Sequence, residues 1–333
     1  MFNKTLFALA AGTALMTGFA ALAQDKIDIV FIGKNTGNPY FDSLTGGFVD
    51  ACAVIACNFE FVAPATAEAT SQIPFITAQI QRGVDVIAIS PNSPDALNQV
   101  FDEARAAGIL VLTVNGDITG SEAHRDATIL PTNFDAVGHD QVEMVGSLIG
   151  YEGEIAILSA TTEAPDQNKW IVGMNETLAN DPKYAKMKLV ATVYGDDQPE
   201  KSTTEMEALL STYPDLKGVI APTTVGIAAA AQVVQSRGIA DKVKVTGLGL
   251  PSEMRAFVKD GTVTGFQLWS PGNEGWLAAH FAVGVKNGTI KNEVGGTFEV
   301  PNLGTITINP NNSMNTQAAL TTFNAENIDD FNF

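Results

Sequence analysis

The chain has 333 residues, 45% of them hydrophobic, and this length favours two lobes over a single core. Its 37 acidic and 19 basic residues give a formal net charge of −18 at pH 7. A chain this acidic is repelled by phosphate backbones and anionic lipid surfaces, which argues against nucleic acid as a partner.

The first 24 residues contain the three parts of a secretory signal peptide. Lys4 supplies a positive charge, the stretch from Thr5 to Ala20 is apolar and uncharged, and Ala21-Leu22-Ala23 offers small residues to a signal peptidase. A membrane anchor or a buried helix is the alternative, but the run is short for a bilayer span of about 20 residues. We expect a signal peptide over 1–24, cleaved after Ala23, and a soluble periplasmic protein without a lipid anchor.

Short apolar runs then alternate with segments of helical period. Four runs rich in Ile, Val and Leu are typical of buried parallel strands: Ile27–Ile32, Phe59–Val62, Val84–Ile89 and Ile109–Val114. Three helices are predicted between them: Phe41–Ile55, Ala69–Gln81 and Pro94–Ala107, the last ending at Gly108.

The two cysteines, Cys52 and Cys57, are five residues apart. In an exported chain they meet an oxidising compartment. If the helix ends near Ile55 and a strand begins near Asn58, their Cβ atoms come within disulfide range. Either a local disulfide or two buried thiols is compatible with this spacing.

A second series of elements follows Asn133. Its predicted strands are Ile155–Leu158, Leu189–Tyr194, Gly218–Ala221 and Val243–Gly247. Its predicted helices are Ala136–Ile149, Asp166–Ala179, Glu200–Thr212 and Val225–Ser236. The tail adds a strand over Thr264–Leu268, a helix over Asn273–Lys286 and a β-rich segment over Phe298–Ile308, broken by Pro301.

This alternation predicts an α/β protein with two Rossmann-like lobes, each built on a parallel sheet. Because the tail returns between the lobes, we expect a three-strand hinge that lets them close around a ligand. The expected N-terminal lobe comprises 25–131 and 264–295. The expected C-terminal lobe comprises 132–263 and 296–333.

Ligands of open α/β sheets bind beyond the carboxyl ends of the strands. In the first series this position holds Lys34, Asn38 and Phe41 after the first strand, and Asn115 and Asp117 after the fourth. A solvated loop lysine, a helix N-cap and a turn are the structural alternatives. We expect Asn115 and Asp117 to accept hydrogen bonds from ligand hydroxyls.

In the second series the corresponding positions hold Asp166 and Gln167, then Pro222, Thr223 and Thr224. Asp166 also suits a helix start electrostatically. Trp269 follows the strand of the tail and could stack on an apolar ligand face. Asp196 and Asp197 could bind a ligand or metal, but capping the helix that begins at Glu200 is the favoured interpretation.

The sequence contains no recognisable catalytic motif. It has no G-x-G-x-x-G, P-loop or G-x-S-x-G motif. His124, His139 and His280 are isolated, without metal-ligand spacing. We therefore expect no enzyme activity, no cofactor and no metal.

Several collinear segments carry a family resemblance: GKNTGNPYFD (33–42), DVIAISPNSPDAL (85–97), ILSATTEAPDQNKW (157–170), VYGDD (193–197), VIAPTTVGIAAAAQ (219–232), VTGLGLPSEM (245–254) and ENIDDF (326–331). On these motifs the chain resembles type I periplasmic sugar-binding proteins of ABC importers, most closely the branch of rhamnose-binding and autoinducer-2-binding proteins. The resemblance implies two lobes, three crossover strands and a ligand in the cleft.

Autoinducer-2 receptors of this branch bind through a Lys after the first strand, an Asp after the fourth, an Asp-Gln pair and a Pro-x-Ala turn. Lys34, Asp166, Gln167 and Pro222 match these positions, whereas Asn115 and Thr224 replace the Asp and the Ala. The turn over 222–226 and the segment 247–251 look more like rhamnose-binding members.

The resemblance therefore implies a periplasmic, monomeric solute-binding protein that delivers a small sugar to an ABC permease. A 6-deoxyhexose such as rhamnose is favoured, because the charged hydroxyl clamps of ribose- and galactose-type members are replaced here. An autoinducer-2 receptor, or a receptor reporting to a membrane sensor, is the alternative.

Overall fold

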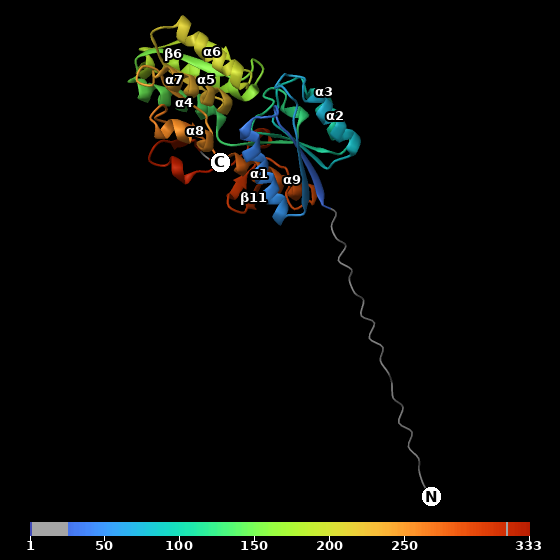
Figure 1. The fold of residues 1–333 in the computed structure, drawn as a ribbon. Coiled ribbons are helices and arrows are strands. Elements are labelled where there is room, and N and C mark those ends of the chain that lie inside the picture. The colour runs from blue at the N-terminus through green and yellow to red at the C-terminus, as the bar shows by residue number, and fades with distance from the viewer. Residues whose placement is uncertain (2–25, 318) are drawn as a thin grey trace.

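The protein is described by a computed structural model that covers residues 1, 26–317 and 319–333. The predicted signal peptide and its cleavage after Ala23 therefore lie outside the described residues, apart from Met1. Within the described chain, no helix combines the length and apolarity needed to cross a membrane. The chain forms two lobes, each built on a parallel sheet packed with helices (Figure 1).

The sheet of the first lobe has six parallel strands in the order β13-β5-β4-β3-β1-β2. They are β1 (Ile27–Ile32), β2 (Cys57–Val62), β3 (Val86–Ile89), β4 (Leu110–Val114), β5 (Ala127–Leu130) and β13 (Ser313–Asn315). The four strands predicted in the first series are confirmed, and β5 and β13 were not predicted.

Alternate residues of β1 face two different groups of helices. Ile29 and Phe31 belong to the core beneath α1 (Pro39–Val54) and α9 (Pro271–Lys286), which pack together. Val30 and Ile32 belong to the core beneath α2 (Ile73–Arg82) and α3 (Asn98–Ala106). Because both faces are buried, Ile29–Ile32 is a continuous apolar run, as is typical of parallel sheets.

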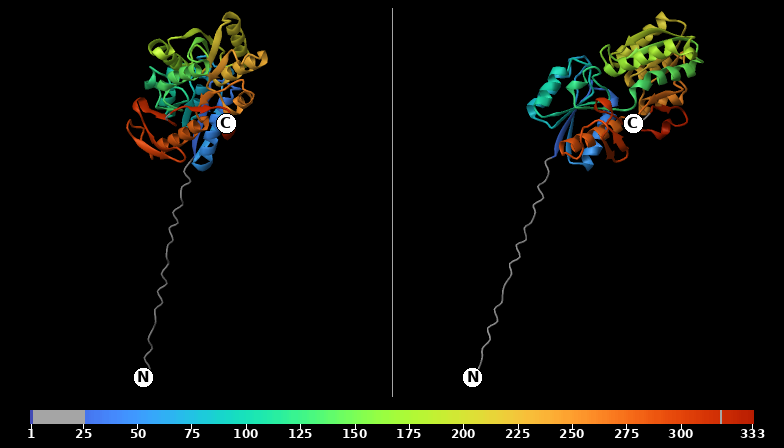
Figure 2. Two further views of the ribbon diagram at one scale, coloured as in Figure 1. Left: turned by 90° about the vertical axis from the view of Figure 1, so that its left-hand side faces the viewer. Right: turned by 180° about the vertical axis from the view of Figure 1, so that it is seen from behind.

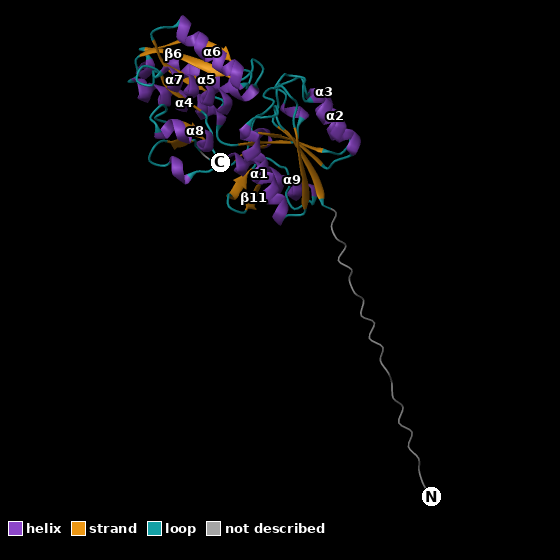
Figure 3. Cartoon of the chain, viewed as in Figure 1, coloured by secondary structure: helices purple, strands orange, loops and turns teal. Residues whose placement is uncertain are grey.

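The second lobe has a four-stranded parallel sheet in the order β7-β6-β8-β9. Its strands are β6 (Gly153–Ser159), β7 (Met187–Tyr194), β8 (Leu216–Ala221) and β9 (Lys244–Gly247). Its helices are α4 (Phe134–Ile149), α5 (Pro165–Asn180), α6 (Pro199–Thr212), α7 (Thr224–Arg237) and α8 (Pro251–Lys259). The strands and the first four helices confirm the prediction, and α8 was not predicted (Figure 3).

The last strands depart from the expected lobe boundaries. β10 (Phe266–Leu268) pairs with β14 (Thr321–Phe323) and is bridged to Leu248 beside β9, so it lies against the second sheet and not the first. β13 pairs with β5 in the first sheet. Assigning 264–268 to the first lobe and the start of 296–333 to the second was therefore wrong. Hydropathy indicated β10 but not β13, and the free sheet edges decide where each of them pairs.

The hairpin of the tail lies near α9. The segment broken by Pro301 is a hairpin of β11 (Thr297–Val300) and β12 (Gly304–Thr307), and the Trp276 indole N–H donates to the Pro301 carbonyl. Short 3₁₀ helices occur in the described part of the chain at Glu122–His124, Pro182–Tyr184, Pro310–Asn312 and Ile328–Asp330. The chain passes between the lobes after β5, after β10 and after β13, and the view from behind separates the lobes clearly (Figure 2).

Two glycines allow α1 and α9 to approach closely. A Cβ atom at Gly47 would lie 1.8 Å from the carbonyl oxygen of Gly272, and one at Gly275 would lie 2.2 Å from that of Leu44. Any side chain at these positions would push the helices apart. The close approach places the N-terminal part of α9 against the middle of α1.

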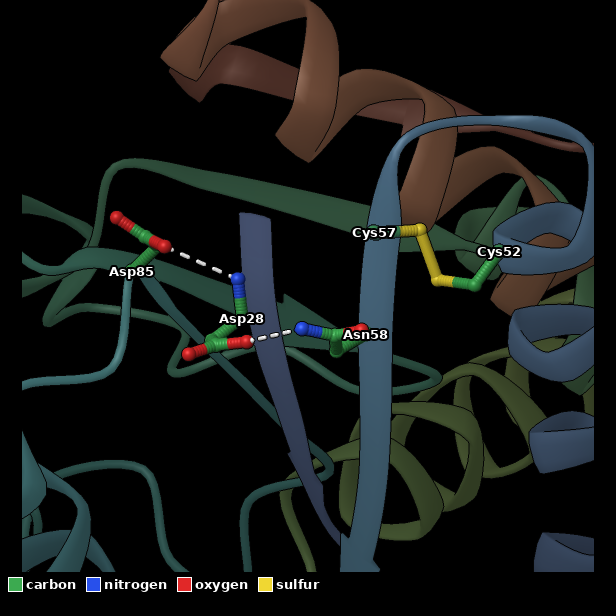
Figure 4. The surroundings of a disulfide bond; sticks show 5 residues. All are labelled: Asp28, Cys52, Cys57, Asn58 and Asp85. Atoms are coloured by element: carbon green, nitrogen blue, oxygen red, sulfur yellow. Dashed lines mark hydrogen bonds between the residues drawn. A yellow bond between two sulfur atoms is a disulfide. The ribbon is translucent and has the colours of Figure 1, made fainter. Parts of the chain in front are cut away.

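The possible disulfide is present. Cys52 near the end of α1 is bonded to Cys57 at the start of β2, with an S–S distance of 2.00 Å and a Cα–Cα distance of 4.9 Å (Figure 4). Next to it, the Asn58 side-chain amide donates to Asp28, whose backbone N–H donates to Asp85. These contacts join the starts of β1 and β2 at the edge opposite the carboxyl ends.

We predict that Cys52→Ala/Cys57→Ala lowers the free energy of unfolding by about 2 kcal/mol, because a short covalent loop is lost from the unfolded chain. Denaturant unfolding of the variant measures this difference. A reducing agent should lower the stability of the wild type to that of the variant. Equal stability of wild type and variant would contradict the prediction.

Glu143 on α4 collects three hydrogen bonds on the surface of the second lobe. Tyr151 donates to one carboxylate oxygen at 2.8 Å, and Tyr184 and Lys183 donate to the other at 2.6 and 2.7 Å. Partial burial alone would raise the pKa of Glu143, but the bonds from Lys183, Tyr184 and Tyr151 lower it to about 2.

We predict that Glu143→Gln destabilises the protein by about 1 kcal/mol at pH 7. The effect is this small because solvent weakens the interactions of a partly exposed site. The folded pKa lies below the unfolded value, so the contribution is present at neutral pH and is lost as pH falls from about 4.5 towards 2. Unfolding measured from pH 7 to pH 3 should show the two proteins converging. Glu152→Gln, which breaks an exposed ion pair with Lys186, is the control and should have no measurable effect.

Candidate functional site

A cavity of about 30 Å³ lies between the lobes, at the carboxyl ends of strands of both sheets. Ten residues predicted from the sequence line it: Lys34, Asn38, Phe41, Asn115, Asp166, Gln167, Pro222, Thr223, Thr224 and Trp269. Five further residues complete the lining: Tyr40, Trp170, Asp197, Leu248 and Leu268. The cavity as it stands has room for one or two water molecules.

A buried ion pair joins the two lobes inside the cavity. The Lys34 ammonium donates to both carboxylate oxygens of Asp166, at 2.7 and 2.8 Å, and lies 3.4 Å from the Gln167 side-chain oxygen. The two charged side chains are only 4% and 1% exposed. Lys34 follows β1, and Asp166 stands in the first turn of α5 just after Pro165.

The second-lobe wall is built from strand-to-helix turns. The Gln167 side-chain amide donates to the Pro222 carbonyl at 3.4 Å, and the Thr223 hydroxyl donates to the Asp197 carboxyl. The Asn35 amide of the first lobe donates to the Asp197 backbone carbonyl at 3.5 Å. Both lobes therefore reach the same buried turn.

Asp197 does not cap α6, so the favoured interpretation of this residue was wrong. The N-cap of α6 is Gln198, without a side-chain bond, and Asp196 pairs with Lys201. Positive φ angles of 54° and 52° at Asp196 and Asp197 turn the second carboxyl into the cavity wall. Burial raises the pKa of Asp197, while the Thr223 bond and the Lys34 charge oppose this shift. A turn formed by two residues with left-handed backbone angles cannot be recognised from the hydropathy of the sequence, which is why the prediction failed here.

Aromatic rings form the other wall. Trp269 and Trp170 meet edge to face with centroids 5.9 Å apart, and Phe134 packs against Trp170 at 5.0 Å. Tyr40 and Phe41 meet edge to face at 5.6 Å. Trp170 was not predicted, although it lies four residues after Asp166 and so on the same face of α5.

A buried polar cluster stands behind the aromatic wall. The Trp269 indole N–H donates to the Tyr40 hydroxyl oxygen at 2.6 Å, and that oxygen lies 2.6 Å from Asn115 Oδ1 and in hydrogen-bond contact with Glu274 Oε1. Burial raises the pKa of Glu274 well above its usual range. Burial and the neighbouring Glu274 likewise raise the pKa of Tyr40. Glu274, on α9, was not predicted because nothing in a helical pattern marks it.

Asp117 lies elsewhere, so its assignment to the ligand site was wrong. Both of its carboxylate oxygens accept hydrogen bonds from Arg125 at 2.5 Å, and one also accepts from Thr113 and from the Ile118 backbone. Arg125 in turn donates to the Asn311 carbonyl. Asp117 therefore ties the turn after β4 to the returning tail.

The histidines lie outside the cavity lining. His124 pairs with Asp102 and His139 with Asp140, and the His280 ring lies against that of Trp276, tilted by 47°, with centroids 4.8 Å apart. Among the residues that the structure describes, no group of three or more His, Cys, Asp or Glu side chains could hold a metal ion.

The cavity thus offers one ammonium, two carboxyls, amides, hydroxyls and aromatic rings. Such a set pairs donors and acceptors with a hydroxyl-rich ligand and places rings against its apolar face. It lacks an arginine or glycine-rich loop for phosphate.

Comparisons with known proteins agree with this architecture. A solved structure of a sugar ABC transporter from Actinomyces odontolyticus is 41% identical, with a TM-score of 0.73, and the match covers 92% of this chain and 98% of that one. An ABC transporter solute-binding protein from Clostridium phytofermentas with bound L-rhamnose is 33% identical, with a TM-score of 0.87 and the same coverages.

The xylose/arabinose-binding protein XylF from Sulfolobus acidocaldarius is 26% identical over 220 residues, which are 63% of this chain and 53% of that protein. The chain thus spans about half the length of this relative. The family model described as periplasmic binding protein domain matches residues 29–290. The chain therefore belongs to the periplasmic binding protein family, a family of binding proteins and not of enzymes.

Proposed function

We propose that this protein is the sugar-binding protein of an ABC importer and that it holds a 6-deoxyhexose, with L-rhamnose favoured, between its lobes. The observation that carries the proposal is the convergence of Lys34, Asp166 and Gln167 with an aromatic wall in one buried cavity. Charged and amide groups bind hydroxyls, and the rings bind the C–H face of a sugar.

The apolar part of the lining supports a deoxy sugar. Leu248 directly follows β9, and Leu268 is the last residue of β10. Both leucines are almost fully buried and line the cavity together with Trp269 and Trp170. A sugar methyl group placed there loses no hydrogen bond. A hydroxyl at the same place would be left unpaired, at a cost of about 1–3 kcal/mol. The bound L-rhamnose of the Clostridium phytofermentas relative supports the same ligand class.

Lys34 and Asp166 bridge the lobes across the cavity, so a sugar that takes the place of their ion pair has to separate them. Because these residues come from different lobes, opening the lobes breaks the ion pair and exposes both groups to water. Ligand hydroxyls can then stand between the ammonium and the carboxylate when the lobes close. The ligand would accept from Lys34 and donate to Asp166.

Export and delivery complete the proposal. The N-terminal signal predicts a periplasmic location, and the binding protein would hand its sugar to an inner-membrane permease as a monomer. An autoinducer-2 receptor is the second candidate, because Lys34, Asp166, Gln167 and Pro222 all line the cavity. Asn115 and Thr224, also in the lining, differ from that pattern and favour the sugar.

We predict that, among rhamnose, fucose, pentoses, polyols and autoinducer-2, a 6-deoxyhexose raises the melting temperature most in a thermal-shift screen. Ligand at a hundredfold excess over its dissociation constant should add about 2.7 kcal/mol of stability. A larger shift with autoinducer-2 would select the receptor alternative. No shift with any of them would contradict a small-sugar site.

We predict that Asp166→Asn and Gln167→Ala each weaken binding of the selected sugar at least about tenfold, because a buried ligand hydroxyl loses its partner. Isothermal titration calorimetry measures the change. Asp42→Asn is the matched control: it removes the same charge from an exposed position next to Phe41 and should leave the affinity unchanged. Unchanged affinity in the Asp166 and Gln167 variants would place the site elsewhere.

A further inference from the structure

The hydroxyl oxygen of Tyr40 has three hydrogen-bond neighbours, and their chemistry is unequal. Trp269 Nε1 can only donate, and it does so at 2.6 Å. Asn115 Oδ1, at 2.6 Å, can only accept. Glu274 Oε1 is also in contact and accepts when ionised but donates when protonated.

Tyr40 has a single proton, which can serve only one of its two oxygen neighbours. If Glu274 were ionised, Tyr40 would donate to it, and Asn115 Oδ1 would face the Tyr40 oxygen at 2.6 Å with no proton between them. If Glu274 is protonated, it donates to Tyr40, and Tyr40 donates to Asn115. With the Asn115 amide oriented so that Oδ1 faces Tyr40, only the second arrangement supplies a proton for every short contact in the cluster.

The surroundings of Glu274 also disfavour a charge. Its side chain is fully buried, and its second carboxyl oxygen, Oε2, has no hydrogen-bond partner among the described residues. No Lys, Arg or His of the described chain forms an ion pair with it. The nearest ammonium in the cavity, that of Lys34, is engaged by Asp166, whose negative charge disfavours a second carboxylate.

We propose that Glu274 is a neutral carboxylic acid whose proton begins a directed chain of hydrogen bonds, from Glu274 to Tyr40 and from Tyr40 to Asn115. In this role Glu274 is a positioning residue, because it does not line the cavity itself. The close approach of α1 and α9 at Gly47 and Gly275 holds its carboxyl against Tyr40.

The direction of these hydrogen bonds determines whether Asn115 offers the ligand a donor or an acceptor. With Oδ1 occupied by Tyr40, the Nδ2 hydrogens of Asn115 are the donors that this cavity-lining residue offers to the ligand. Asn115 therefore donates to the ligand, contrary to the acceptor role expected from the sequence. This donor role rests on the sugar-binding function proposed above, and it selects a ligand that places an acceptor oxygen at Asn115.

Infrared difference spectroscopy of the protein at pH 7 tests the protonation directly. The spectrum of wild type minus Glu274→Gln should contain the C=O stretching band of a protonated carboxyl group. Asp197→Asn is the matched control for the second buried carboxyl of the site. A difference spectrum with carboxylate bands alone would overturn the proposal.

Tyr40→Phe tests the direction of the bond and keeps the proposal falsifiable if Glu274→Gln does not fold. Removing the acceptor of the Glu274 proton should shift the protonated carboxyl band to higher frequency. A band that is unchanged in Tyr40→Phe would show that Glu274 does not donate to Tyr40, which would overturn the chain of hydrogen bonds.

Calorimetry with L-rhamnose tests the consequence for the ligand. Asn115→Asp replaces the amide donor by an acceptor and should weaken binding about tenfold or more. Asn175→Asp makes the same change on the exposed face of α5 and is the control. Unchanged affinity in Asn115→Asp would overturn the donor role. If wild type does not bind L-rhamnose but keeps the carboxyl band, the proposed ligand fails and the neutral Glu274 stands.

Discussion

The ion pair of Lys34 and Asp166 couples the arrangement of the lobes to the chemistry of the cleft. Each charge would cost several kcal/mol to bury alone, and the partner that compensates it comes from the other lobe. The closed arrangement is therefore tied to a polar contact that a ligand has to replace. A ligand needs an acceptor for Lys34 and a donor for Asp166, because otherwise one buried charge stays uncompensated. The ion pair therefore contributes to ligand specificity as well as to the contact between the lobes.

The cost of burying a charge also governs the other acidic groups of the cleft. Lys34 can compensate only one carboxylate, and Asp166 takes that role. Asp197 and Glu274 are also buried, and burial raises the pKa of each. Their hydrogen-bond partners are the hydroxyls of Thr223 and Tyr40, and the Lys34 charge offsets only part of the effect of burial on the pKa of Asp197. The cleft of a strongly acidic protein is thus a place where additional negative charge is avoided.

The sequence predicted the lobes and most of the cavity because both depend on local pattern. Parallel strands buried on both faces are continuous apolar runs, and the polar residues directly after them lie at one edge of a sheet. Asp117 has the same local signature as Asn115, but its carboxylate is bound by Arg125, eight residues later, and so faces away from the cavity. Glu274 meets Tyr40, 234 residues away in sequence, through helix packing that no local pattern encodes. The placement of β10 and β13 likewise depends on which sheet edge is free.

The Cys52–Cys57 bridge also bears on how such a protein matures. The sequence contains two cysteines, so only one intramolecular pairing exists and no incorrect isomer competes with it. The bonded residues are neighbours in the chain, and closing so short a loop requires only one helix end and one strand start. Oxidative folding therefore needs no disulfide shuffling, and the covalent bond can be in place before the two lobes have assembled around the cleft.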